Sequence, residues 1–204
     1  MNGLVQIETA DRALLASLAR SMAEAVRRSG AWIVCRPGCT QCCIGPFGIT
    51  QLDALRLRSG MSALASADPE RAELVRARAA AYIAAITPEY PGDPRTGALH
   101  DEERLPESMD AEPCPALDPE TGCCDLYEAR PITCRAFGPV TKVGEDTFAA
   151  CELCYEGATE EERIQCAVEV DPEGLECEIL TRLDAAGLAG LTIVAYALLE
   201  DERQ

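Results

Sequence analysis

Cysteine is the residue type that this sequence concentrates in a pattern able to do chemistry. Its twelve cysteines stand at positions 35, 39, 42, 43, 114, 123, 124, 134, 151, 154, 166 and 177. The first four lie within a single short segment, from Cys35 to Cys43. Cysteine thiolates are strong ligands for zinc and for iron–sulfur clusters, and close spacing lets several thiolates reach one centre. The pattern therefore indicates a metal centre held by sulfur.

The first cysteine cluster has local features that bring its thiols together. The Pro37–Gly38 dipeptide suits the two central positions of a type II turn, which folds Cys35 back toward Cys39. The Cys39-x-x-Cys42 spacing adds a further thiol, and Cys43 follows directly. Adjacent cysteines diverge along the backbone, so one tetrahedral zinc ion rarely uses both. We therefore expect two metals, or one larger inorganic cluster, at this segment.

The second cysteine-rich stretch, from Cys114 to Cys154, shows little helical or strand periodicity. Arginines adjoin the thiols of both stretches, at Arg36, Arg130 and Arg135. A guanidinium beside a metal thiolate offsets negative charge and donates hydrogen bonds to sulfur. The alternative is that these arginines are solvated or pair with carboxylates nearby in the sequence, such as Glu128 and Asp125. Both interpretations are open at the level of sequence.

The order of these motifs is similar to a known family. The segments are Cys35-Arg-Pro-Gly-Cys39-x-x-Cys42-Cys43-Ile, Cys114-Pro-x-Leu, Cys124-x-x-Tyr127 and Arg130-Pro-x-x-Cys134-Arg135. They resemble the YkgJ-like cysteine-cluster family, a zinc- or iron-chelating domain named for a CxxCxxCC pattern. The spacing departs from that pattern between Cys35 and Cys39, where one additional residue stands. The resemblance implies that the family positions are Cys35, Cys39, Cys42, Cys43, Cys114, Cys124 and Cys134, with Cys151 or Cys154 as the eighth.

An all-cysteine donor set favours an iron–sulfur cluster, with [4Fe–4S] first, over zinc. The only histidine, His100, lies away from both cysteine groups. We predict an iron–sulfur protein that acts in electron transfer, or as a redox module for a protein partner. The alternatives are a structural zinc module without redox chemistry, and metal sequestration or delivery. The candidate ligands are Cys35, Cys39, Cys42, Cys43, Cys114, Cys124, Cys134 and Cys151.

The remaining cysteines have simpler interpretations. Cys166 and Cys177 fall in predicted helices with no partner spacing, so we expect them in the hydrophobic core. Cys123 is either a ligand or a packing residue. A disulfide scaffold is disfavoured because no secretory signal is evident. A nucleophilic cysteine needs a nearby base, and His100 is the sole imidazole, so no enzymatic activity is assigned.

Composition restricts the environment and the partners of the chain. Its 204 residues are 48% hydrophobic, which suffices for a core in one domain over residues 1–204. That domain has a metal-binding region at 35–154 and helical flanks at 1–34 and 155–204. A net charge of -17, with Lys142 the sole lysine, disfavours nucleic acid and anionic membranes but suits docking to a basic protein. Without a signal or a long apolar run, the chain is expected to be cytoplasmic.

Capping signals and periodicity predict the elements around the cysteines. Helices are expected over 10–29 before Gly30, from Thr50 to about Gly60, over 69–86, after Thr159, after Asp171, and over 188–200. A proline-rich loop or linker is expected over 88–116, and a short hairpin over 140–143 and 147–150. The expected fold is mainly α, a small helical domain in which two irregular cysteine-rich loops converge on a metal centre.

Overall fold

The computed structural model describes residues 2–144, 146–148 and 150–199 of the chain. Contacts between Cα atoms divide the chain into two compact units. Unit 1 comprises residues 1–36 and 132–182, and unit 2 comprises residues 37–131 and 183–204. The expected metal-binding region and its flanks are therefore distributed over both units. The assignment of residues 1–204 to a single domain stays a prediction.

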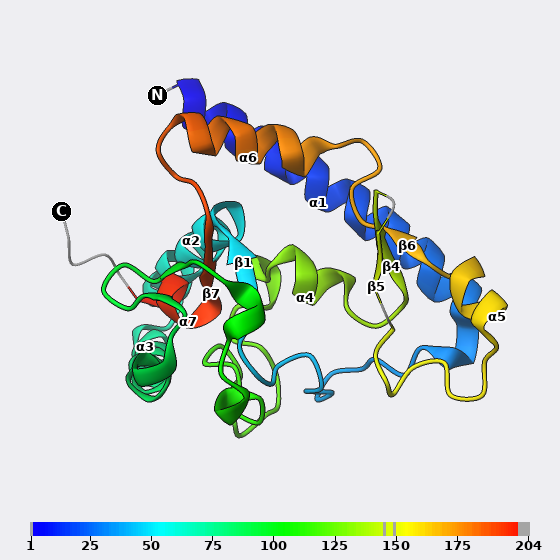
Figure 1. Cartoon of the computed structure of the whole chain (residues 1–204), viewed down its shortest axis with the longest axis horizontal. Helices are drawn as coiled ribbons and strands as arrows, with labels where there is room; N and C mark the ends of the chain where they lie inside the picture. The colour runs from blue at the N-terminus through cyan, green and yellow to red at the C-terminus, as the bar shows by residue number, and fades with distance from the viewer. Residues whose placement is uncertain (1, 145, 149, 200–204) are drawn as a thin grey trace. The chain divides into compact units, whose positions relative to one another are not determined.

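The architecture is mainly α, as the sequence predicts (Figure 1). The helices are α1 (Asn2–Ser29), α2 (Gln51–Ala67), α3 (Pro69–Ile86), α4 (Ile132–Ala136), α5 (Glu160–Gln165), α6 (Leu175–Ala185) and α7 (Val194–Leu198). The strands are β1 (Gly48–Thr50), β2 (Gly92–Asp93), β3 (Ala98–Leu99), β4 (Thr141–Val143), β5 (Asp146–Phe148), β6 (Val168–Glu169) and β7 (Leu191–Ile193). Short 3-10 turns are η1 (Gly30–Trp32), η2 (Thr87–Glu89), η3 (Glu102–Arg104), η4 (Glu107–Met109) and η5 (Tyr127–Ala129). None of the helices in the described ranges is both long and apolar enough to cross a membrane.

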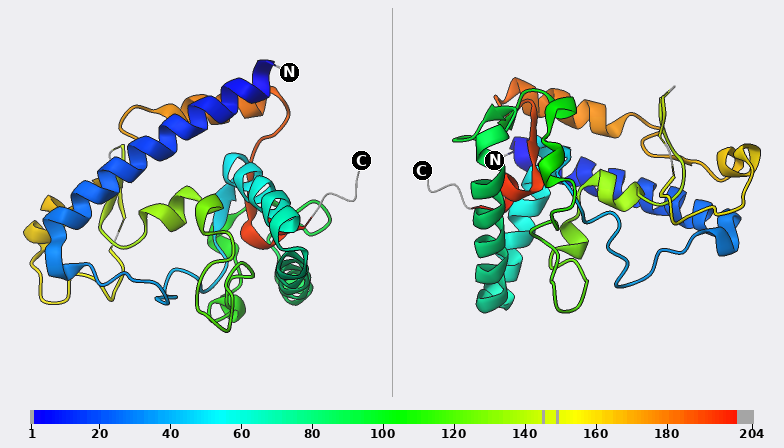
Figure 2. Two further views of the ribbon diagram at one scale, coloured as in Figure 1. Left: turned by 180° about the vertical axis from the view of Figure 1, so that it is seen from behind. Right: turned by 60° about the horizontal axis from the view of Figure 1, so that its bottom comes forward.

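Unit 1 is built on the long helix α1, and the unit 1 part of α6 runs alongside it (Figures 1 and 2). Strand β4 lies in the middle of a small sheet, antiparallel to β5 and parallel to β6. The predicted hairpin is confirmed, but its strands cover 141–143 and 146–148 rather than 140–143 and 147–150; positions 145 and 149 lie outside the described residues. Gly30 follows α1 with a φ of 53°, a left-handed conformation that glycine adopts at helix ends.

Side-chain caps explain where three helices begin. The Thr50 hydroxyl accepts a hydrogen bond from the Asp53 amide at 3.2 Å and starts α2. The Asp68 carboxylate accepts from the Arg71 amide at 3.0 Å, and proline follows at the first position of α3. Thr159 forms a full capping box at α5. Each cap satisfies an amide that the first helical turn leaves unpaired, so these predicted starts are confirmed.

Three predicted helix boundaries are wrong. Helix α1 begins at Asn2 rather than near Ala10. Helix α2 continues through Gly60 to Ala67, because this glycine gives room for a neighbour rather than ending the helix. A Cβ atom at Gly60 would lie 2.5 Å from the Cβ of Ala129. Helix α6 begins later than the Asp171 signal suggests, at Leu175, whose amide donates to the Asp171 carboxylate at 2.9 Å. The carboxylate thus caps α6 from a preceding turn.

The predicted helix over 188–200 is also wrong, because pairing with distant strands overrides the local apolar pattern. Strand β7 pairs antiparallel with β1 over Gly48–Thr50 and with β3 at Leu99, and only α7 after it is helical. The resulting sheet has the order β1-β7-β3-β2 and belongs to unit 2. The segment over 88–116 is an ordered loop that contains β2 and β3.

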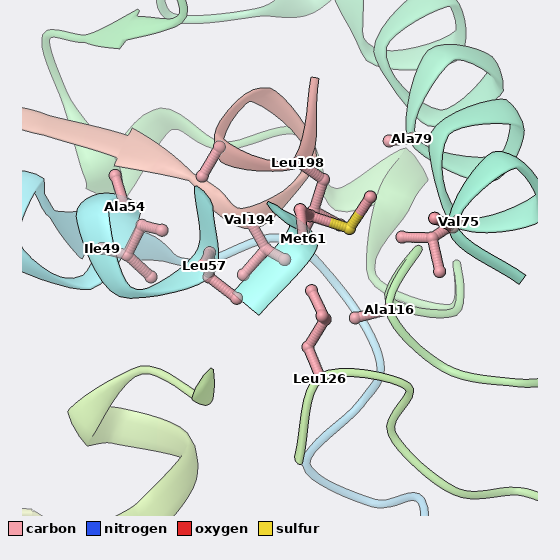
Figure 3. Close-up of a cluster of buried hydrophobic side chains, with 12 residues drawn as sticks. Ile49, Ala54, Leu57, Met61, Val75, Ala79, Ala116, Leu126, Val194 and Leu198 are labelled. Atoms are coloured by element: carbon pink, nitrogen blue, oxygen red, sulfur yellow. The ribbon is translucent and has the colours of Figure 1, made fainter. Parts of the chain in front are cut away.

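The main core of unit 2 lies between α2, α3 and α7 (Figure 3). Figure 3 shows Ala116 and Leu126, each two residues beyond a cysteine of the second loop, pointing into this cluster. The half-buried Cys114 and Cys124 pack against the same residues. Burial of this apolar surface therefore anchors the loop that carries two of the candidate ligands. The cluster consists of Ile49, Ala54, Leu57, Met61, Ala72, Val75, Ala79, Ala116, Leu126, Val194, Ala197 and Leu198.

Candidate metal centre

Tight turns shape the two cysteine loops of unit 2. In the first loop, Gly38 has a φ of 84°, the value that a type II turn needs after Pro37. A further turn closes with the Cys43 amide donating to the Thr40 carbonyl at 2.8 Å. The second loop is a small hairpin in which Leu117 pairs with Cys124 in an antiparallel bridge. These turns use glycine and proline where the sequence places them, so the irregular loops have defined local geometry.

Backbone hydrogen bonds join the two loops next to the thiols. The Cys114 amide donates to the Cys43 carbonyl at 2.7 Å, and the Gly45 amide donates to the Glu112 carbonyl at 2.9 Å. Ile44 and Pro113 form the isolated bridge between these contacts. Cysteines that are far apart in the sequence are thereby neighbours within unit 2.

Four thiols gather at this junction, from Cys42, Cys43, Cys114 and Cys124. The Cys43 thiol donates to the Cys42 sulfur, which lowers the pKa of Cys42 to about 6 and raises the pKa of Cys43. Burial raises the pKa of Cys114 to about 12 and also raises the pKa of Cys124. The charges of Cys42, Cys114 and Cys124 raise the Cys43 pKa further, so the four groups act on one another. The expected divergence of Cys42 and Cys43 is wrong, since their side chains contact each other.

Hydrogen-bond donors and a cation surround these sulfurs. The Ala116 amide hydrogen-bonds to the Cys114 sulfur, and the Leu126 amide to the Cys124 sulfur; both contacts favour the thiolate. The Arg130 charge lowers the pKa of Cys42 and of Cys124, partly opposing burial at the second. Groups that would offset the negative charge of metal-bound thiolates are thus in place before a metal binds.

Arg130 is held in place by Tyr127 of the same loop. Its Nε donates to the Tyr127 carbonyl at 2.9 Å, and its guanidinium carbon lies 3.5 Å from the centroid of the Tyr127 ring. Arg130 therefore acts electrostatically on the thiols, which is one of the two interpretations that the sequence left open. Arg36 and Arg135 lie in unit 1.

A clamp from α3 holds the second loop, and its cations were not predicted from the sequence. The Asp125 carboxylate is fully buried and pairs with Arg71 and with Arg78, the latter at 2.5 Å. Arg78 also donates from Nε to the Pro115 carbonyl at 2.9 Å. Asp125, the residue after Cys124, therefore ties the second loop to α3. The signal was the spacing of Arg71, Val75, Arg78 and Tyr82, which places them on one helix face.

The other cysteines of unit 2 lie differently. Cys39 is half-buried in the first loop. Cys123 is exposed, and its thiol donates to the Thr121 carbonyl at 3.7 Å, away from the bridge that Cys124 makes. Adjacent residues of an extended strand point to opposite faces, and here Cys124 takes the core side. The exposure of Cys123 excludes a packing role in the core, and a ligand role for it stays a prediction.

The remaining predicted ligands, Cys35, Cys134 and Cys151, belong to unit 1. The Cys35 sulfur lies 3.3 Å from the point where a Cβ on Gly138 would stand, and the Gly138 carbonyl accepts from the Cys151 amide at 2.9 Å. Cys134 lies on the short helix α4. Cys35 and Cys151 thus both lie beside Gly138.

A buried cluster in unit 1 contains three cysteines, Cys151, Cys154 and Cys166, packed around Tyr155. The core interpretation of Cys166 is confirmed, with 4% of the residue exposed. The same interpretation of Cys177 is wrong, because this residue is exposed on α6.

The donor set of unit 2 fits a thiolate-bound metal in its chemistry. The four thiols come from two loops tied together by backbone hydrogen bonds, with amide donors and Arg130 beside them. In the part of the chain that the structure describes, no three His, Cys, Asp or Glu side chains are already arranged as ligands of one ion. A cysteine sulfur is one bond beyond Cβ, so rotation about χ1 alone moves it between staggered positions. Chelation therefore requires side-chain rotation within a backbone that already gathers the thiols.

Comparison with known proteins identifies the family. The model of the CxxCxxCC family, described as "Putative zinc- or iron-chelating domain", matches residues 34–155, which is more than half of the chain. Comparison with curated proteins and with solved structures gave no match. The resemblance found in the motifs is confirmed: the chain belongs to the CxxCxxCC family of zinc- or iron-chelating domains.

Proposed function

We propose that Cys42, Cys43, Cys114 and Cys124 bind an iron–sulfur cluster, with [4Fe–4S] favoured. The chain would act in electron transfer or as a redox module for a protein partner. The observation that carries this proposal is the gathering of these four thiols by two loops whose backbones are hydrogen-bonded beside them. When bound, the cluster supplies one-electron redox chemistry, and the protein sets its potential through charge, hydrogen bonds to sulfur and solvent access.

The surroundings of the sulfurs support iron–sulfur chemistry. All four donors are cysteines, while His100 is exposed in the loop between β3 and η3. Amides of Ala116 and Leu126 already hydrogen-bond to two of the sulfurs, and such bonds stabilise the added negative charge of a reduced cluster. Arg130 contributes a positive charge beside the same group of thiols.

The other predicted ligands remain part of the proposal. Cys39 is the nearest candidate in sequence to the four thiols, and Cys35, Cys134 and Cys151 stay predicted ligands in unit 1. The net charge of -17 suits docking to a basic redox partner. We expect the chain to work in the cytoplasm, where thiols are kept reduced.

A structural zinc site is the second candidate function, and the clamp on the second loop favours it. Asp125, Arg71 and Arg78 fix this loop by interactions that redox chemistry does not need. A zinc ion held by four thiolates would close such an assembly without taking part in a reaction. Zinc would then contribute to folding free energy alone.

Anaerobic purification followed by iron, zinc and acid-labile sulfide analysis separates these candidates. An iron–sulfur centre gives a visible absorption band with iron and sulfide in equal amounts; a zinc site gives colourless protein with zinc. The matched pair of variants is Cys124→Ser and Cys123→Ser, since the two cysteines are adjacent but only Cys124 lies among the four thiols. The proposal expects metal loss in Cys124→Ser alone. Equal metal content in both variants would contradict the assignment of these ligands.

A further inference from the structure

The hydroxyl of Tyr82 is buried without a hydrogen-bond partner. Tyr82 lies on α3, one turn beyond Arg78, and only 8% of the residue is exposed. Within the described part of the chain, its oxygen makes no hydrogen bond. Burying an unpaired hydroxyl costs free energy, and such groups are rare in folded proteins. Phenylalanine would fill the same space without that cost, so the hydroxyl needs an explanation other than packing.

Tyr82 lies beside the metal-binding loops. It lines a small pocket together with Gly45 and Pro46 of the first loop and Cys114 and Pro115 of the second. Burial raises the pKa of the Tyr82 phenol, and the charge of Cys114 raises it further, before those of Glu112 and Asp110. The phenol is therefore protonated at neutral pH and available as a donor. Among the charged groups, Cys114 raises the Tyr82 pKa most.

We propose that Tyr82 is a positioning residue whose hydroxyl donates a hydrogen bond to the Cys114 sulfur once that sulfur is a metal-bound thiolate. This inference rests on the proposed function, because it requires Cys114 to be a ligand. A neutral thiol is a weak acceptor, whereas a thiolate carries the charge that makes a hydrogen bond strong. The hydroxyl would then be unpaired in the metal-free protein and paired in the loaded one.

Tyr90 provides a matched comparison within the same unit. It has the same exposed fraction, 8%, and packs in the same apolar cluster as Tyr82. Its hydroxyl, however, already donates to the Gly97 carbonyl at 2.8 Å. The two tyrosines thus differ in whether the hydroxyl has a partner before metal binds.

The test compares Tyr82→Phe and Tyr90→Phe with the wild type in the full chain, reduced and free of oxygen. Co²⁺ is the probe, because its thiolate complexes absorb through charge transfer from sulfur. For Tyr82→Phe we expect Co²⁺ affinity to fall about tenfold or more, since hydrogen bonds to charged groups are the strong class. The charge-transfer band should also move to longer wavelength, because a thiolate without its donor gives up an electron more easily.

In the metal-free protein, Tyr90→Phe rather than Tyr82→Phe should be the destabilised variant. Removing the unpaired hydroxyl leaves Tyr82→Phe as resistant to urea as the wild type, or more so. Tyr90→Phe loses a satisfied hydrogen bond, so it should unfold at lower urea concentration while it keeps the wild-type affinity for Co²⁺. Wild-type affinity and an unshifted band in Tyr82→Phe would overturn the inference and leave the thiolate centre standing. A wild-type chain that binds no Co²⁺ would overturn both.

Discussion

Replacing Arg78 by methionine should loosen the second cysteine loop without altering a cysteine. Methionine keeps an apolar stem on α3 but removes the guanidinium. That group donates to the Asp125 carboxylate at 2.5 Å and to the Pro115 carbonyl at 2.9 Å. The change therefore removes two contacts from the segment that holds Cys114 and Cys124.

The expected loss is about 2 kcal/mol. Hydrogen bonds to charged groups contribute about 1.5–3 kcal/mol each, and loss of one partner from a buried ion pair costs about 3–5 kcal/mol. Two facts place the expected loss of stability below the sum of these contributions. Arg71 still pairs with the fully buried Asp125, and the Arg78 side chain is 27% exposed, so water already hydrates part of it. A loss of 2 kcal/mol raises the population of the open loop about 30-fold.

Amide hydrogen exchange on the reduced, metal-free chain measures this population directly. The informative amides are those of Leu117, Asp118 and Asp125, which donate to carbonyls of the same loop at 2.8–2.9 Å. Their protection should fall about 30-fold in Arg78→Met. The control is Glu73→Gln on the same helix, where an ion pair with a 75% exposed carboxylate contributes little. A change of less than about twofold in Arg78→Met, equal to that control, would refute the clamp.

Three further changes test individual contacts. The Cys42 thiol, with its pKa lowered to about 6, should be alkylated at half its maximal rate near pH 6, and Cys43→Ala should move this midpoint upward because the donor to the thiolate is lost. A wild-type midpoint near pH 9 would contradict this. Gly60→Ala should lower unfolding free energy by about 1–2 kcal/mol, because the clash with Ala129 outweighs the gain in helix propensity. Adding Ala129→Gly to Gly60→Ala should restore the lost free energy. An unchanged free energy of unfolding in Gly60→Ala alone would contradict the clash, because it would show that the helix shifts to accept the methyl group. Thr50→Ala should cost about 1 kcal/mol in urea unfolding through loss of the α2 cap, and an unchanged midpoint would exclude that role.

Local rules predicted the helices whose ends are set by their own side chains. Thr50, Asp68 and Thr159 each accept a backbone amide as expected, and α3 has the predicted bounds. Long-range contacts set the features that were missed. Gly60 ended the predicted helix because the sequence does not reveal Ala129 behind it, and Leu191–Ile193 became a strand because β1 pairs with it.

Cysteine spacing and the family resemblance predicted eight candidate ligands but not which of them the fold brings together. The choice between Cys123 and Cys124 depends on the bridge between Leu117 and Cys124, which is a matter of register. Tyr82 and the clamp from α3 were missed for a different reason. Their helix is rich in alanine and is not adjacent in the sequence to either cysteine loop, so only the fold brings it to the thiols.

X-ray absorption at the metal edge of the anaerobically purified chain tests the central assignment most directly. The account predicts a first shell made of sulfur alone, with metal–metal scattering from an iron–sulfur cluster, and weaker sulfur scattering in Cys124→Ser but not in Cys123→Ser. A first shell dominated by oxygen or nitrogen would contradict the claim that thiolates of the two loops hold the metal.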